Sequence, residues 1–313
     1  MRPGLKVTAI AVIIFSSVLM TSAPAPKKAV KHTIVEKSIG DIPFVFIPAG
    51  SFKMGRDVKG RDYAPSRTVK ITKGFWIGKY EITQKQYRDL KGTNPCTESR
   101  YGEGDSLPLF NVSWYDAVDF CNELSLKHGL KPYYNISKNG TDDDNISDHD
   151  EVKRGVTVNK DADGFRLPTE AQWEYACMGT KLSDFYWGDN QSWDGAGAYA
   201  WHMFNAGQKN YSRGRFWWVK YHKVRKPGQK RPNLFGVYDM SGNVAEWCFD
   251  RYSPSYPSAD KEDPDGGDNE FRYRVVRGGS ILDAPKDLAG YKRWPVEPFE
   301  KTGTNGIRVV LPE

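Results

Sequence analysis

The last third of the chain constrains the fold most, because it carries three short blocks rich in Gly, Asn and aromatic residues. They read PNLFGVYDMSGNVAEW at 232–247, RGGS at 277–280 and GIRVV at 306–310. Each block alone is a weak signal, but seven in a fixed order predict one fold that spans the chain. No linker separates them, which indicates a single domain. The preceding blocks lie at 44–55, 69–87, 108–121 and 164–176.

Together these blocks resemble the formylglycine-generating-enzyme family, also called the sulfatase-modifying-factor family. The resemblance runs from Ile42 to Val310. It implies an α+β chain with a C-type-lectin-like fold of the formylglycine-generating-enzyme type, irregular and rich in loops. We therefore expect one domain over residues 41–313, preceded by a targeting segment and a tether.

The chemistry of that family does not follow from the resemblance, because fold and function are separate properties. Its oxidase uses two cysteines after the Gly-Gly-Ser turn to bind copper, and those positions fall on Asp283 and Leu288. A carboxylate and an isobutyl group cannot form a soft thiolate site. We therefore expect no oxidase activity and no copper. The family's scaffold positions are kept at Arg293, Pro298, Gly306 and Arg308.

Residues 1–25 are typical of a targeting segment, with Arg2 and Lys6 ahead of the apolar run Val7–Met20. That run is short for a membrane span, which needs about 20 apolar residues. We expect an exported protein at the cell surface or in the periplasm. Because proline follows both candidate cleavage alanines, membrane attachment through an uncleaved segment stays open. Residues 26–40 are expected to form a tether.

The net charge of +6 is mild, and acidic and basic residues are mixed along the chain. The basic run 220–231 is interpreted as a solvated loop, and with no nucleic-acid-binding motif beside it we expect no nucleic-acid partner. The four cysteines permit three pairings. In the resembling family, the positions of Cys121 and Cys177 often bond to cysteines near the C-terminus that this chain lacks. Both are therefore expected to be buried free thiols.

Capping patterns predict three helices that begin after Thr83, Ser113 and Thr169. A hairpin is expected from 44–47 and 51–54, closed by Pro48-Ala-Gly50. The acidic stretch 141–145 lacks the spacing of a calcium loop and is expected to be a flexible loop. Residues 186–230 are aromatic and Gly-rich, and little regular structure is expected there.

The turn DMSGNVAE at 239–246 is a candidate metal site. A tight loop that offers two carboxylates and carbonyl oxygens suits a hard cation with six to eight ligands. In the resembling family this turn binds calcium, and a structural calcium ion is expected here, the alternative being that Asn243 and Glu246 only cap the turn. The matching ligands are the side chains of Asp239 and Glu246 and the carbonyls of Gly242 and Val244.

The segment 281–305 is the candidate ligand-binding surface, because it has no strand or helix period and lies between two scaffold blocks. Trp294 and Phe299 are the expected anchors, since rigid aromatic side chains dominate interface energetics. The side chains that we expect to be largely exposed and tolerant of substitution, unlike Arg293, Gly306 and Arg308, are those of Leu282, Asp283, Ala284, Trp294, Val296, Phe299 and Thr304. The candidate residues are Leu282, Asp283, Ala284, Lys286, Asp287, Tyr291, Trp294, Val296, Phe299, Glu300, Thr302 and Thr304.

This arrangement resembles the variable proteins of diversity-generating retroelements, the treponemal ones in particular. In those proteins a C-terminal stretch of the same fold is rewritten at adenine-containing codons. The resemblance implies a receptor-like protein that binds a protein or glycan ligand on another cell. The alternatives are a formylglycine-generating-enzyme-like enzyme or accessory factor, and a structural envelope protein.

Overall fold

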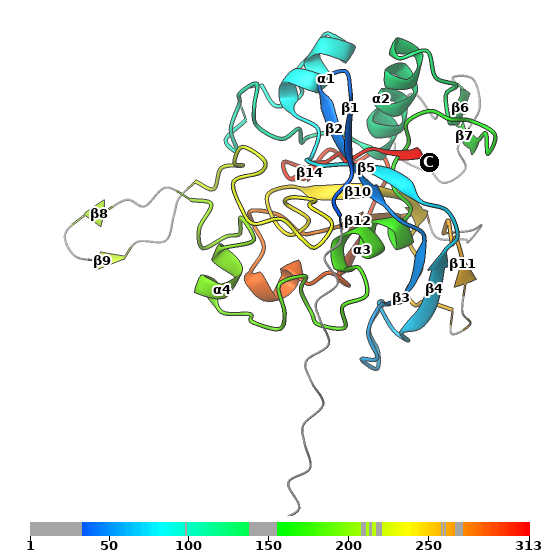
Figure 1. Ribbon diagram of the computed structural model, residues 1–313. Coiled ribbons are helices and arrows are strands. Elements are labelled where there is room, and N and C mark those ends of the chain that lie inside the picture. Colours follow the sequence, from blue (N-terminus) through cyan, green and yellow to red (C-terminus); the bar gives the residue numbers. More distant parts are fainter. Residues whose placement is uncertain are drawn as a thin grey trace, which may run out of the picture. The chain divides into compact units, whose positions relative to one another are not determined.

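The computed structural model describes residues 33–97, 99–137, 155–207, 211–212, 215–216, 221–257, 259, 261–266 and 272–313 (Figure 1). The chain divides into two units, of which 33–313 is the one described below. The expected targeting segment, the acidic stretch 141–145 and Lys220 at the start of the basic run lie outside the described residues. Among the residues that the structure does describe, no helix is long and apolar enough to cross a membrane.

Three capped helices begin where the sequence predicts them. Thr83, Ser113 and Thr169 each accept a hydrogen bond from the backbone N–H three residues on, and the side chain of that third residue bonds back to the cap. These reciprocal bonds satisfy two backbone donors that a helix start leaves open. The helices are α1 (Gln84–Lys91), α2 (Trp114–Lys127), α3 (Glu170–Met178) and the short α4 (Trp193–Gly197).

The first sheet joins the two ends of the unit in the antiparallel order β1-β2-β5-β15. Its strands are β1 (Glu36–Ile39), β2 (Ile42–Ile47), β5 (Phe75–Gly78) and β15 (Val310–Pro312). The expected tether over 26–40 is therefore wrong at its end, since residues 36–39 pair with β2.

The expected hairpin is also wrong, because β2 and β3 (Gly50–Met54) belong to different sheets. β2 pairs with β5, whereas β3 pairs with β4 (Arg67–Ile71) in a second sheet of order β11-β4-β3. β11 (Lys261–Glu262) completes that sheet. Two two-stranded ribbons lie outside these sheets, β6 (Tyr134–Ser137) with β7 (Gly155–Val158), and β8 (Tyr211–Ser212) with β9 (Arg215–Phe216).

The sheet that carries the C-terminal blocks has the order β13-β12-β10-β14. Its central strand β10 pairs antiparallel with β12 and parallel with β14. Figure 1 shows α3 lying beside β10 and β12. The strands are β10 (Ala245–Arg251), β12 (Arg274–Arg277), β13 (Arg293–Val296) and β14 (Asn305–Gly306), and the 3₁₀ helix η1 (Pro285–Leu288) lies between β12 and β13.

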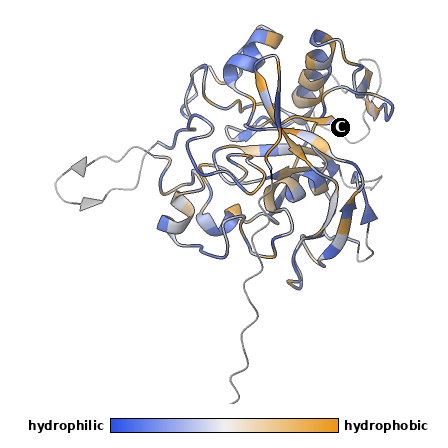
Figure 2. Ribbon diagram, in the orientation of Figure 1, coloured by the Kyte–Doolittle hydropathy of each residue, from blue (hydrophilic) through white to orange (hydrophobic). Residues whose placement is uncertain are grey.

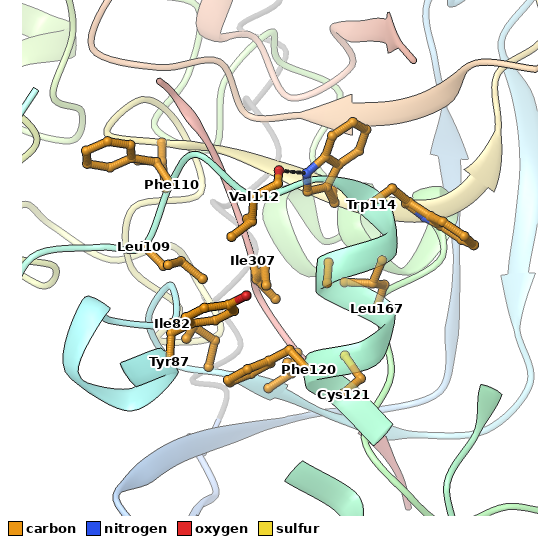
Figure 3. Packing of buried hydrophobic residues seen from close by; sticks show 14 of the residues in the cluster. Ile82, Tyr87, Leu109, Phe110, Val112, Trp114, Phe120, Cys121, Leu167 and Ile307 are labelled. Carbon is orange, nitrogen blue, oxygen red and sulfur yellow. Dashed lines mark hydrogen bonds between the residues drawn. The ribbon is translucent and has the colours of Figure 1, made fainter. Parts of the chain in front are cut away.

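Two large clusters of buried apolar side chains support these sheets, and aromatic rings form much of both. The first gathers around the inner face of α2, where the Phe120 ring stacks on Tyr87 (Figure 3). Figure 2 shows mostly hydrophilic residues on α1, whereas hydrophilic and hydrophobic residues alternate along α2. All four cysteines are buried free thiols, as expected for Cys121 and Cys177, and burial raises the pKa of the Cys96 thiol to about 12.

Candidate ligand-binding surface

Three buried arginines hold the segment 281–305 in place: Arg277 ends β12, Arg293 begins β13 and Arg308 follows β14. Arg293 forms a bidentate pair with Glu170 of α3, with both N–O distances at 2.7 Å. The hydroxyl of Tyr256 donates a further bond of 2.9 Å to the same carboxylate. Such planar bidentate contacts fix orientation as well as position.

The other two arginines repeat this arrangement. Arg277 pairs with Glu174, one turn along α3 from Glu170, and donates to the carbonyl of Gly290 at 3.0 Å. Arg308 pairs with Glu246 of β10 at 2.6 Å and donates to the carbonyl of Gly78 at 2.8 Å. Buried charges are stable only when paired and hydrogen-bonded. Together with Arg293–Glu170, these pairs are the arginine frame referred to below.

Gly306 belongs to the same rigid part of the structure. A Cβ atom at this position would lie 2.3 Å from the carbonyl oxygen of Leu109, closer than any real contact. Because a backbone oxygen cannot move aside as a flexible side chain does, we expect that even alanine is not accepted there. The prediction that Arg293, Gly306 and Arg308 form the scaffold is thus consistent with their burial and contacts.

Asp283 lies in a tight turn, and its side chain supports the turn. One carboxylate oxygen accepts hydrogen bonds from the backbone N–H and the hydroxyl of Ser280, at 2.7 and 2.8 Å. The Asp283 carbonyl accepts a bond of 3.1 Å from the N–H of Met203. Burial raises the pKa of the Asp283 carboxyl, and the Ser280 bonds oppose that shift. The expectation that Asp283 is largely exposed and free to change is therefore wrong.

The stretch around Trp294 forms a strand, although no strand was expected there. β13 pairs antiparallel with β12, so Trp294 lies opposite Val276 and is half-buried. Val296 packs against the first core cluster. In the order β13-β12-β10-β14, β13 and β14 are three strand spacings apart, roughly 14 Å. Trp294 and Thr304, which directly precedes β14, therefore lie toward opposite edges of the sheet.

The stretch 298–302 lies against the start of α2. The carbonyls of Pro298 and Thr302 accept hydrogen bonds of 2.9 Å from the N–H groups of Trp114 and Asn111. Phe299 is half-buried and packs against the first core cluster. The expectation of a largely exposed Phe299 is therefore wrong, because the ring has a structural role.

The remaining candidate residues differ in exposure, so the segment 281–305 does not form one uniform surface. Leu282, Lys286 and Glu300 are exposed, and Leu282 keeps 39% of its surface. The side chains of Ala284, Asp287, Tyr291, Thr302 and Thr304 are half-buried. The expected large exposure is therefore wrong for Ala284 and Thr304, as it is for Trp294 and Val296. Leu288, at the second cysteine position of the resembling family, is fully buried against Phe185 and Ala200.

The candidate metal turn places Asp239 and Glu246 in the protein interior. Asp239 Oδ2 accepts a bond of 2.6 Å from the N–H of Gly228, whereas Oδ1 is buried and has no hydrogen-bond partner among the described residues. Burial raises the pKa of Asp239 to about 6. An unpartnered buried carboxylate oxygen is a natural ligand for a hard cation or a site for a proton.

Glu246 fits the expected calcium site less well. Its carboxylate accepts bonds from Arg308 and one of 2.6 Å from the indole N–H of Trp173. The backbone N–H of Val244 donates to Glu81. Among the described residues, no group of three or more His, Cys, Asp or Glu is arranged to hold a metal ion. The Glu246 carboxylate is thus engaged by other groups, and the calcium site with the carbonyls of Gly242 and Val244 stays a prediction.

A cavity of about 340 Å³ lies beside Tyr291 and was not anticipated from the sequence. Its lining includes Lys53, Arg56 and Lys181, which come from the end of β3, the loop after it and the turn after α3. These positions are far apart in the chain and follow no motif. In the sequence, only Lys53 and Arg56, which flank Met54-Gly55 in the block 44–55, could have indicated a site. Basic residues next to a glycine are too common for this to be specific.

The sheet order, the capped helices and the loop-rich C-terminal half define an α+β protein with a C-type-lectin-like fold. Residues 35–312 match the family described as "Sulfatase-modifying factor enzyme 1-like domain", and the chain belongs to this family.

Relatives in this family have different names. The chain is 40% identical over 241 residues to the "Chaperone protein LppX" of Paenibacillus barcinonensis, covering 75% of this chain and 77% of that protein. It is 39% identical over 293 residues to the formylglycine-generating enzyme of Streptomyces coelicolor, covering 84% and 86%. Among solved structures, Treponema denticola variable protein 1 superimposes with a TM-score of 0.72 at 26% identity, covering 90% of this chain and all of that one.

Proposed function

We propose that this protein is an exported, receptor-like ligand-binding protein whose C-terminal segment 281–305 displays changeable contact residues on a fixed scaffold. The observation that carries the proposal is the arginine frame. It fixes both ends and the middle of the segment through groups that are fully or almost fully buried. The exposed side chains of Leu282, Lys286 and Glu300 can then change without disturbing the frame, because surface substitutions usually alter stability by less than about 0.5 kcal/mol.

The structural similarity to Treponema denticola variable protein 1 supports diversification by a retroelement. That protein is named as variable, and it superimposes over 90% of this chain. The exposed positions lie in the connections between strands, Lys286 within η1, and such connections are where recognition residues are placed most often. The contact set is narrower than the sequence indicates, because Asp283 and Phe299 have structural roles. Trp294 remains a candidate anchor, on the edge strand β13.

A binding role is favoured over oxidase chemistry by the residues at the two cysteine positions. Asp283 supports a turn and Leu288 is packed in a cluster of apolar side chains, so neither supplies a thiolate. Burial raises the pKa of the Cys121 and Cys177 thiols, which disfavours the thiolate form that binds soft metals. The ligand we expect is a protein or glycan on another cell, and we expect export to the cell surface or periplasm.

A second candidate is an accessory or chaperone function, favoured by the 40% identity to a protein named as a chaperone. The two functions differ in how binding responds to the C-terminal segment. A variable receptor gains its specificity from 281–305, whereas an accessory factor uses a surface that stays the same between copies.

The test is binding of the full chain to an array of glycans and cell-surface proteins. In one variant Leu282, Lys286 and Glu300 are all changed to Ser. We expect this variant to lose or change the array signals of the wild type while keeping its melting temperature.

The matched control changes three exposed residues elsewhere, Glu103, Leu126 and Lys127, to Ser. It should reproduce the wild-type signals. If the first variant keeps every signal and the control loses them, the binding surface lies outside 281–305 and the proposal fails.

A further inference from the structure

The cavity beside Tyr291 is enclosed by segments that are distant in sequence. The loop after β3 supplies Arg56, the end of α3 and the turn that follows it supply Met178 and Lys181, and Tyr291 lies just before β13. Its volume of about 340 Å³ is at the lower end of the range for small-molecule sites, which is about 300–1,000 Å³. A site of this size accommodates one small ring rather than an extended chain.

The walls combine apolar and hydroxyl-bearing groups. Met178 and the ring of Tyr291 provide apolar surface, and the Arg56 guanidinium lies 5.4 Å from the centre of that ring. Ser66 and Ser183 add hydroxyl oxygens. Sites of this mixed character fix a ligand's orientation through a few polar groups set in apolar walls.

Two acidic groups of the lining are already satisfied. Glu174 pairs with the buried Arg277 and accepts a bond of 2.8 Å from the N–H of Gly55. Asp57 accepts bonds of 2.7 and 2.8 Å from the backbone and hydroxyl of Ser66. These bonds lower the pKa of Asp57, so it remains an anion.

Around the cavity, the basic groups outnumber the acidic groups once the Glu174–Arg277 pair is set aside. Arg56 pairs with Asp184 at 2.9 Å, and the carboxylates of Asp184 and Asp57 contribute two negative charges. Against these stand Arg56, Lys53 and Lys181, so the cavity and its direct partners carry one excess positive charge. The Lys181 ammonium donates to the carbonyl of Tyr186 and keeps two N–H groups for another acceptor.

We propose that this cavity binds a sugar ring that bears one carboxylate, such as the terminal uronic acid of an acidic glycan. A single excess positive charge matches a carboxylate better than a phosphate monoester, which carries a charge of about −1.5 to −2. The hydroxyls of Ser66 and Ser183 suit the hydroxyl groups of the ring, and Tyr291 and Met178 suit its less polar face. This inference deepens the proposed function and rests on it for its setting, because Tyr291 belongs to the segment 281–305.

The test titrates the full chain with glucuronate and follows binding by calorimetry, with glucose, glucose 6-phosphate and inorganic phosphate as comparison probes. We expect glucuronate to bind at least tenfold more tightly than any of the other three. Equal binding of glucose would show that the carboxylate is not recognised, and equal binding of either phosphate probe would show that the site selects no carboxylate sugar. Each of these results overturns the proposal, as does the lack of saturable glucuronate binding.

Variants locate the site. Lys181→Ala should weaken glucuronate binding at least tenfold, and Lys181→Arg should restore most of it because the charge returns. Tyr291→Ala, which removes the ring that forms part of the apolar wall, serves as a second variant if Lys181→Ala does not fold, and it should weaken glucuronate binding at least threefold. Lys59→Ala is the matched control, since Lys59 is exposed in the loop after β3 and does not line the cavity. If the control weakens binding as much as Lys181→Ala does, or if Tyr291→Ala binds as wild type does, the assignment to this cavity fails.

Failure here is distinguishable from failure of the proposed function. Loss of array signals on changing Leu282, Lys286 and Glu300, with no glucuronate binding, would refute only the cavity. Glucuronate binding that depends on Lys181, with array signals that ignore those three residues, would refute only the variable receptor.

Discussion

Replacing Arg308 with alanine tests the arginine frame most severely. Arg308 is fully buried, and its guanidinium makes contacts of 2.6 to 3.0 Å with both oxygens of Glu246. It also donates to the carbonyls of Gly78 and Tyr238 at 2.8 and 2.9 Å. Alanine therefore removes the paired cation from a buried carboxylate, which keeps the indole N–H of Trp173 as a donor. It also takes a donor from two carbonyls, and water cannot easily replace it there.

The expected loss is large because removing one partner of a buried ion pair costs about 3–5 kcal/mol. Unfolding entropy near 2.1 cal/mol/K per residue gives about 0.6 kcal/mol/K for the unit 33–313. A loss of about 4 kcal/mol thus lowers the melting temperature by about 7 °C. Urea unfolding followed by tryptophan fluorescence measures the free energy, and calorimetry measures the temperature.

The double variant Arg308→Met with Glu246→Gln removes both charges and should recover at least about 1 kcal/mol of the loss, since contacting residues couple. Arg88→Ala is the control, because Arg88 pairs with Asp105 on the surface at 2.7 Å. It should leave the melting temperature at the wild-type value. A loss below about 1 kcal/mol for Arg308→Ala, or strictly additive effects in the double variant, would refute the reasoning.

Three further predictions concern protons, calcium and catalysis. Burial raises the pKa of Asp239 to about 6 and, together with Glu170, that of Asp250 to about 7, from an ordinary 3.8. The native state then binds more protons than the unfolded state between about pH 4 and 7, so the free energy of unfolding should fall as pH rises through that window. Urea unfolding should show a smaller fall for Asp239→Asn, and an equal fall would contradict the assignment. Calcium should raise the melting temperature of the wild type and not of Asp239→Asn, because a ligand of the native state stabilises it. If neither protein responds to calcium or to a chelator, the predicted calcium site does not exist. A cysteine-containing sulfatase peptide should remain unconverted with or without copper, and formylglycine detected by mass spectrometry would end the non-enzyme interpretation.

The helices were predictable from the sequence because their signals are local. Thr83 with Gln86 and Thr169 with Gln172 each satisfy the backbone within three residues. The pairing of strands was not predictable in the same way. β2 and β3 are separated by only two residues, yet their partners β5 and β4 were chosen by burial in different sheets.

The location of the candidate surface was predictable from the sequence, but the exposure of its individual residues was not. Pro295 interrupts any strand signal around Trp294, but proline is tolerated on an edge strand, and β13 is at the edge of its sheet. The lack of periodicity in 281–305 did not imply exposure, because Asp283 and Phe299 are held by Ser280 and by the core. The cavity beside Tyr291 depends on three distant segments, which one sequence does not bring together.

The central claim is that a fixed frame carries interchangeable contacts, and sequencing codons 277–310 across a population of the source organism tests it most directly. The account predicts substitutions at adenine-containing codons that include Leu282, Lys286 and Glu300, with Arg277, Arg293 and Arg308 unchanged. It also predicts a near-copy of the region beside a reverse transcriptase gene. One invariant sequence in every cell, or changes that fall equally on the three arginines, would contradict it.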